Sequence, residues 1–165
     1  MHPKILETFI KQAQKVTLTS RAVYNDQLGL AEKRLHEIFG YDKALFMNTG
    51  VEAGESAIKF ARRWGYVKKN VPANKATILF AKGNFWGRTI AACASSDDPD
   101  RYLDFGPFDG LHFDLIDYGS TDALEAALKK DPNIVAYMLE PIQGEKGVVI
   151  PPPGTPVLTQ DTSRR

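Results

Sequence analysis

A run of small and polar residues at positions 47–55, MNTGVEAGE, could bind an anion through its backbone. It follows the apolar residues 44–46 and leads into an amphipathic stretch with helical spacing, so it lies where a strand is expected to turn into a helix. Such a turn leaves backbone N–H groups unpaired at the positive end of a helix dipole. The segment therefore predicts a site for a phosphate or another anion.

Three kinds of phosphate site and one structural explanation compete for this turn. A P-loop needs Gly-x-x-x-x-Gly-Lys-Ser/Thr, but the glycine after Gly50 comes one residue too early and Glu55 replaces the lysine. The Gly-x-Gly-x-x-Gly fingerprint of dinucleotide binding is also absent. A third interpretation is the phosphate site of a pyridoxal-phosphate enzyme, where Thr49, Gly50 and Val51 would meet one phosphate. An ordinary helix cap at Asn48 or Thr49 explains the same residues.

Two more groups of polar and aromatic residues follow predicted strands. They are GNFWGRT at 83–89 and EPIQGE at 140–145. Ligands of open α/β sheets collect beyond the carboxyl ends of the strands, so we expect both groups to share one rim with the phosphate turn. That rim would combine an anion site, aromatic rings beside an arginine, and two carboxylates.

Each of these side chains has a functional and a structural explanation. Phe85 could stack on a flat aromatic cofactor, or it and Trp86 could pack into the core below the loop. Arg88 could form a bidentate fork to a substrate carboxylate, or lie on the surface at a helix start. Glu140 and Glu145 could orient a cofactor or mask an arginine, or they could simply be solvated.

Composition narrows the class of protein. The chain has 165 residues, enough for one core, and its 21 basic and 20 acidic residues give no field that would attract nucleic acid or an anionic membrane. Cys93 is the only cysteine, so no internal disulfide is possible, and we expect it to be a packed thiol in a reducing compartment. The three histidines are too scattered for a metal site. With no signal-peptide core or membrane-length apolar run, we expect a soluble intracellular chain without a targeting segment.

Strands alternate with helices along the sequence. Helices are expected at 3–15, 26–39, 51–69 and 120–130, and strands at 43–47, 77–82, 114–118 and 134–139. The second helix should bury a row of apolar residues, namely Leu28, Ala31, Leu35 and Ile38. Residues 83–113 are expected to be irregular apart from helical turns around 88–94, and residues 155–165 to be disordered or non-native in origin. The fold class is therefore α/β, with a mostly parallel sheet.

Several strings resemble one family in order and spacing. LTSRAVYN, FMNTGVEAGESAIKFARRWGY, GNFWGRT, FGPF and EPIQGEKGVVIPPPG are similar to the ornithine aminotransferases, a group of class III, fold-type I pyridoxal-phosphate-dependent aminotransferases. The resemblance implies that residues 1–154 are part of the large, cofactor-binding domain of a homodimer. It also implies a mitochondrial or cytoplasmic location and an enzyme that moves the δ-amino group of ornithine to 2-oxoglutarate, giving glutamate semialdehyde and glutamate.

The resemblance also assigns roles to the candidate residues. Thr49, Gly50 and Val51 would hold the phosphate. Phe85 would stack on the pyridine ring, with Glu140 close to the cofactor. The residues that would contact substrate are Trp86 in the pocket wall, Arg88 on a carboxylate, and Glu145, which would pair with a second arginine and move aside for the dicarboxylate.

Some of the family's residues have no counterpart in this sequence. None of the thirteen lysines lies in the context of the lysine that forms the Schiff base with the cofactor, and the aspartate that pairs with the pyridine nitrogen is also missing. We therefore expect the chain to be a fragment that is inactive alone. The alternative is a non-catalytic protein that associates with full-length subunits.

Overall fold

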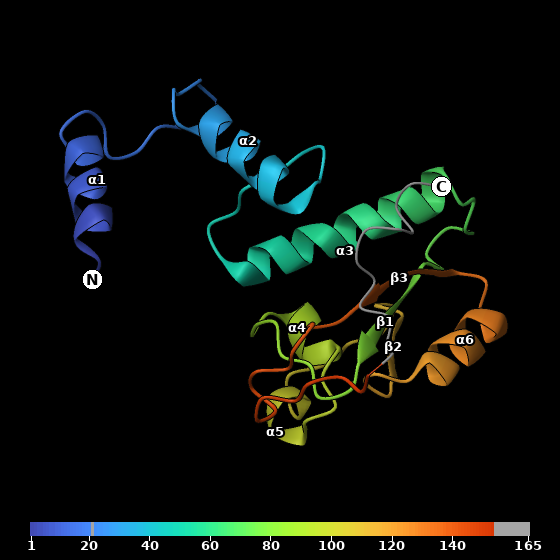
Figure 1. Cartoon of the computed structure of the whole chain (residues 1–165). Coiled ribbons are helices and arrows are strands. Elements are labelled where there is room, and N and C mark those ends of the chain that lie inside the picture. Colours follow the sequence, from blue (N-terminus) through green and yellow to red (C-terminus); the bar gives the residue numbers. More distant parts are fainter. Residues whose placement is uncertain (21, 154–165) are drawn as a thin grey trace. The chain divides into compact units, whose positions relative to one another are not determined.

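The structure is a computed structural model that describes residues 1–20 and 22–153. It divides into two compact units, the first spanning residues 1–46 and the second beginning at Met47. The helices and strands of both are labelled in Figure 1. The expected tail at 155–165 lies outside the described residues.

The first unit contains the two helices that its periodicity predicts. Helix α1 spans Pro3–Ala13 and begins with proline in its first turn, and α2 spans Leu28–Phe39. Gly40 ends α2 in the left-handed conformation with φ of 75°, which glycine adopts without steric cost. Neither helix has a fully buried residue, and the expected buried row was wrong, because Leu28, Ala31 and Ile38 are exposed and Leu35 is only partly buried. Their spacing does make one apolar face, but within the first unit that face is not buried.

The strand expected at 43–47 was also wrong, because these residues form no strand in the described structure. A strand is defined by hydrogen bonds to a neighbour, and the three described strands pair only with one another. Leu45 and Phe46 remain about half exposed, at 52% and 44%. An apolar run can show that a segment is suited to a sheet, but it cannot supply the partner.

The second unit is built on a parallel sheet of three strands. They are β1 (Thr77–Ala81), β2 (Phe113–Ile116) and β3 (Ile134–Met138), in the order β2-β1-β3. Phe80 of β1 pairs with Leu115 on one side and Met138 on the other. Every residue of β1 is buried, as expected for a central strand covered on both faces. The predicted α/β class with a parallel sheet is confirmed.

Four helices accompany this sheet. Helix α3 (Gly50–Val67) packs against β3, and α6 (Thr121–Lys130) packs against β2 (Figure 1). Ile58 of α3 joins Ile78 and Phe80 of β1 in the core. The short helices α4 (Ile90–Ala94) and α5 (Pro99–Tyr102) follow β1 and precede β2 in the sequence. The first matches the expected turns around 88–94, whereas α5 interrupts a segment expected to be irregular.

Because the strands are parallel, their carboxyl ends face the same side of the second unit. The segment that leaves β1 carries residues 82–89, and the segment that leaves β3 carries residues 139–145. The sheet therefore brings two of the three sequence motifs to one edge. The third motif, the predicted phosphate turn, begins α3 in the same unit.

Candidate active site

The predicted phosphate turn is a helix N-terminus closed by a capping box. Thr49 is the N-cap of α3, and its hydroxyl oxygen accepts a hydrogen bond from the N–H of Glu52 at 3.2 Å. The carboxylate of Glu52 accepts in return from the N–H groups of Asn48 at 2.8 Å and Thr49 at 2.9 Å. Capping by Thr49, one of the sequence-based alternatives, is therefore present.

The cap leaves room for an anion. Three of the N–H groups at this helix start are used, but those of Gly50 and Val51 have no acceptor within the described residues. Both lie in the first turn, where the helix dipole favours negative charge. The Thr49 hydroxyl accepts one bond and keeps its own proton free to donate. A cap and an anion site are thus compatible here, although the negative charge of Glu52 offsets part of the positive potential that the helix offers to an anion.

Gly87 lies directly against this turn. A Cβ on Gly87 would overlap the side chain of Val51, and its φ of 152° is one that residues with a side chain rarely adopt. The glycine therefore allows the 83–89 segment to lie against the N-terminus of α3. Two motifs that are distant in the sequence meet at this contact.

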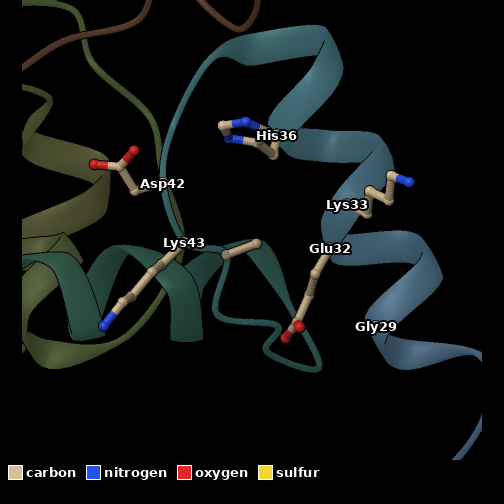
Figure 2. A pocket seen from close by; sticks show the side chains of 7 residues that line it. Gly29, Glu32, Lys33, His36, Asp42 and Lys43 are labelled. Atoms are coloured by element: carbon tan, nitrogen blue, oxygen red, sulfur yellow. The ribbon is translucent and has the colours of Figure 1, made fainter.

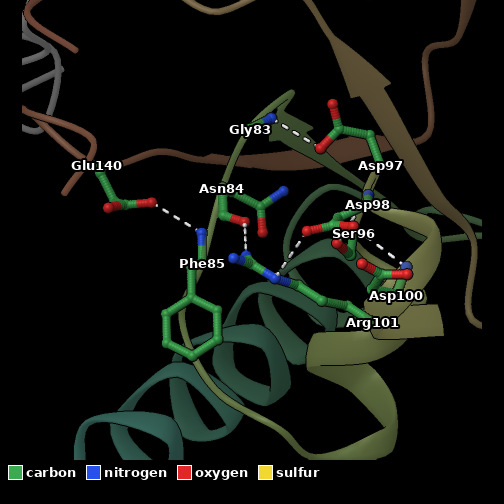
Figure 3. A network of polar contacts seen from close by, with 9 residues as sticks. All are labelled: Gly83, Asn84, Phe85, Ser96, Asp97, Asp98, Asp100, Arg101 and Glu140. Atoms are coloured by element: carbon green, nitrogen blue, oxygen red, sulfur yellow. Dashed lines mark hydrogen bonds and ion pairs between the residues drawn. The ribbon is translucent and has the colours of Figure 1, made fainter. Parts of the chain in front are cut away.

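Phe85 is held by its backbone, and its ring is half-buried. Its N–H donates to Oε1 of Glu140 at 2.9 Å (Figure 3). The other carboxylate oxygen of Glu140 accepts from the N–H of Gly144 at 3.2 Å. Two guanidinium groups lie near the ring, with Cζ of Arg101 at 4.7 Å and Cζ of Arg88 at 5.5 Å from its centroid. The predicted neighbours Phe85, Arg88 and Glu140 thus share one region.

Trp86 packs inward. Its ring is parallel to that of Phe80, with centroids 6.0 Å apart and an interplanar angle of 7°, and its indole N–H donates to Oγ of Ser95 at 2.8 Å. A Cβ on Gly54 would lie 2.7 Å from the Trp86 ring, so this glycine makes room for it. The packing matches the core interpretation of Trp86. Its predicted contact with substrate stays a prediction.

A cavity of about 460 Å³ opens beside Phe85. Its wall includes three of the predicted residues, Phe85, Arg88 and Glu145, together with Arg101 and Cys93. Arg88 is exposed and lies near the ring of Phe85. Its guanidinium has no ion pair or hydrogen bond within the described structure, so its fork is free to meet a carboxylate. Thr49, Gly50, Val51, Trp86 and Glu140 do not line this cavity.

Tyr118 fixes the chain around Glu140. Its hydroxyl lies 3.1 Å from the carbonyl oxygen of Glu140 and 2.9 Å from that of Pro141, so it can donate to either. Removal from water raises the pKa of Tyr118, and the charge of Glu140 raises it further. The hydroxyl therefore remains a donor through the neutral pH range. The sequence placed Tyr118 at a strand end but carried no signal for this contact.

Arg101 is the other residue of the site that sequence reasoning missed. Asp98 and Pro99 form a recognisable helix start, with the Asp98 side chain accepting from the N–H of Asp100 at 3.1 Å. That signal could have placed Arg101 on α5. Nothing local to α5 indicates that its guanidinium reaches the ring of Phe85.

The first unit has a cavity of its own, of about 470 Å³, between α2 and the residues that follow it (Figure 2). Its wall carries side chains of both charges and comprises Gly29, Glu32, Lys33, His36, Asp42, Lys43 and Ala44. None of the predicted site residues belongs to it.

Within residues 1–20 and 22–153, no group of three or more His, Cys, Asp or Glu side chains is arranged to hold a metal ion. No helix in the same part of the chain is long and apolar enough to cross a membrane.

The fold and the site belong to a defined class of protein. Residues 1–161 match the family described as aminotransferase class-III, and the chain belongs to this family, which depends on pyridoxal phosphate. Its relatives include ornithine aminotransferases. The chain is 56% identical over 153 residues to the mitochondrial enzyme of Drosophila ananassae, covering 93% of this chain and 35% of that protein. The mitochondrial enzyme of Rattus norvegicus is also 56% identical over 153 residues, with coverage of 93% and 34%.

Solved structures give the same result. The ornithine aminotransferase of Toxoplasma gondii, which has partial occupancy of pyridoxal phosphate at its active site, matches with a TM-score of 0.89 and 51% identity. The match covers 93% of this chain and 36% of that one. The resemblance in sequence and the fold-type I architecture are confirmed, and the chain spans about 35% of the length of the curated relatives it matches.

Proposed function

We propose that this chain supplies the cofactor-binding part of an ornithine aminotransferase. The reaction is transfer of the δ-amino group of ornithine to 2-oxoglutarate, which gives glutamate semialdehyde and glutamate. The observation that carries the proposal is the cavity of about 460 Å³ that Phe85, Arg88 and Glu145 line together. Glu140 is tied to the same place by its hydrogen bond to the N–H of Phe85.

The described residues fit pyridoxal phosphate at both of its ends. The free N–H groups of Gly50 and Val51, with the Thr49 hydroxyl, suit a phosphate at the start of α3. The half-buried ring of Phe85 offers a face to a flat pyridine ring. The contact between Gly87 and Val51 joins these two regions.

The remaining residues act on substrate and on the frame of the site. Arg88 binds a carboxylate of the amino donor or acceptor, Trp86 supports the pocket wall, and Glu145 supplies a carboxylate that yields to an incoming dicarboxylate. Glu140 accepts from the N–H of Phe85 and keeps the ring at the cavity. Bound pyridoxal phosphate supplies the electron sink, whereas these side chains supply orientation and charge.

The whole reaction needs residues beyond this set. None of the thirteen lysines matches the family's cofactor-binding lysine, so we propose that this lysine, the aspartate at the pyridine nitrogen and the second arginine belong to the rest of a longer enzyme. That enzyme would be a homodimer of the mitochondrial matrix or the cytoplasm.

Calorimetry with three probes tests the cofactor site directly. Pyridoxine 5′-phosphate carries the ring and the phosphate but no aldehyde, so it cannot react with surface lysines. It should bind more tightly than pyridoxine, which lacks the phosphate, and than inorganic phosphate, which lacks the ring. Phe85→Leu should lower the affinity for pyridoxine 5′-phosphate and pyridoxine, the two probes with a ring, by about three- to tenfold, and should leave the affinity for inorganic phosphate unchanged. Equal affinity for inorganic phosphate and pyridoxine 5′-phosphate would instead show a general anion site.

A turnover assay tests the remainder of the proposal. With pyridoxal phosphate, ornithine and 2-oxoglutarate, the chain alone should form no glutamate semialdehyde. Robust turnover would show that the residues assigned to the rest of the enzyme are not needed.

A further inference from the structure

We propose that Arg101 is a positioning residue that holds the ring of Phe85 in the orientation that receives the cofactor. The inference rests on the proposed function, because it concerns the ring expected to stack on pyridoxal phosphate. It adds a residue from α5, an element that contributes none of the predicted site residues.

The guanidinium of Arg101 is fixed on three sides. Its Cζ lies 4.7 Å from the centroid of the Phe85 ring, one nitrogen donates to the carbonyl oxygen of Asn84 at 3.2 Å, and Nε lies 3.2 Å from the carboxylate of Asp98 (Figure 3). An arginine over an aromatic face is attracted by the negative charge of the ring's π system. Arg101 therefore contacts both the backbone before Phe85 and the ring itself.

The carbonyl that Arg101 contacts belongs to a rigid segment. The buried amide of Asn84 donates to the carbonyl oxygens of Ala81 at 2.9 Å and Ser95 at 2.7 Å. The N–H of Gly83 donates to the carboxylate of Asp97 at 2.8 Å (Figure 3). The backbone leading to Phe85 is thus tied down on both sides. The ring is the part that still has rotamer freedom, and Arg101 restricts it.

Arg88 and Arg101 line the same cavity, but they are engaged differently. Arg88 is exposed and lies farther from the ring, at 5.5 Å, with no ion pair in the described residues. Arg101 has an ion pair and a backbone hydrogen bond in addition to the ring. A substrate carboxylate can therefore use the fork of Arg88, whereas Nε and one terminal nitrogen of Arg101 are already engaged by Asp98 and Asn84. This division makes Arg101 a positioning residue.

The first test needs no cofactor. In a ¹⁵N NMR spectrum of the chain, the Nε–H signal of Arg101, assigned by its loss in Arg101→Lys, should be shifted upfield by the ring current of Phe85. Phe85→Leu should remove that shift. If the Arg101 signal does not respond to Phe85→Leu, the guanidinium does not lie on the ring, and the inference is overturned.

The second test measures the consequence for binding. Arg101→Met keeps the apolar stem and should lower the affinity for pyridoxine 5′-phosphate by about three- to tenfold. In the Phe85→Leu background the same substitution should have little further effect, because Arg101 acts through the ring. An equal loss in both backgrounds, or no loss in the wild-type background, would contradict a positioning role.

The control is Arg34→Met. Arg34 forms an ion pair with Glu37 at 3.1 Å, three residues away, as Arg101 does with Asp98, but it lies in α2 of the other unit. It should leave affinity unchanged, and circular dichroism should show that all variants remain folded. If the wild-type chain binds no pyridoxine 5′-phosphate, the proposed function fails. The Nε–H signal then still decides whether Arg101 holds the ring.

Discussion

The N–H of Phe85 donates to the carboxylate of Glu140 at 2.9 Å, and this bond joins the segments that leave β1 and β3. The same carboxylate accepts from the N–H of Gly144 at 3.2 Å. Two backbone donors at the carboxyl edge of the sheet therefore depend on one side chain. Glu140 serves the architecture of the site whether or not it also faces a ligand.

Glu140→Gln should destabilise the fold. An amide offers one acceptor oxygen, so one of the two backbone donors loses its partner and the other loses a charge-assisted bond. We expect a loss of about 1–2 kcal/mol in the free energy of unfolding, measured by urea titration. Glu145→Gln is the control, because Glu145 is exposed, and it should leave the urea midpoint unchanged. Equal effects of the two substitutions would contradict the role given to Glu140.

Gly87→Ala should destabilise the fold and distort the phosphate turn. The new methyl group would overlap Val51 and would have to be accommodated at a φ of 152°. We expect about 1–3 kcal/mol of destabilisation from the overlap and weaker binding of pyridoxine 5′-phosphate. Gly29→Ala is the control, since a Cβ there meets no atom within 4 Å. If calorimetry gives both variants the affinity of the wild-type chain, the Gly87–Val51 contact does not shape the site.

Tyr118 should make stability fall in alkali. Its pKa is raised in the folded chain, first by removal from water and then by the charge of Glu140. The unfolded chain therefore loses this proton first, at a pKa of about 10, so the contribution is present below that pH and is lost as the pH rises toward the folded pKa. Wild-type stability should decline more steeply than that of Tyr118→Phe between about pH 9 and about pH 11. Parallel pH profiles from urea titrations would show that Tyr118 ionises equally in both states.

Much of the fold could be predicted because its signals are local. Helix α6 has Ser120 as its cap, Asp122 in its first turn and lysines in its last, and all of these act within a few residues. The prediction of a strand at 43–47 was wrong because strand pairing is not local and depends on a distant segment. The predicted burial of the apolar face of α2 was wrong for a similar reason, because periodicity shows which face can be buried but not what covers it.

The candidate site also combines features that the sequence could predict with features that it could not. The order of the strands brings the motifs after β1 and β3 to one edge, so the proximity of Phe85 and Glu140 followed from topology. The direction of a side chain did not. Trp86 turns inward because Gly54, on another element, leaves space for its ring. Arg101 reaches Phe85 because α5 approaches the loop, and no spacing along the chain encodes that approach.

Amide NMR during a titration with pyridoxine 5′-phosphate can show whether the start of α3 and the ring of Phe85 hold one cofactor. We expect saturable shifts that are largest at the N–H groups of Gly50 and Val51 and at Phe85, and we expect inorganic phosphate to shift only the signals of Gly50 and Val51. Shifts confined to other residues, such as those lining the cavity of the first unit, would contradict this expectation.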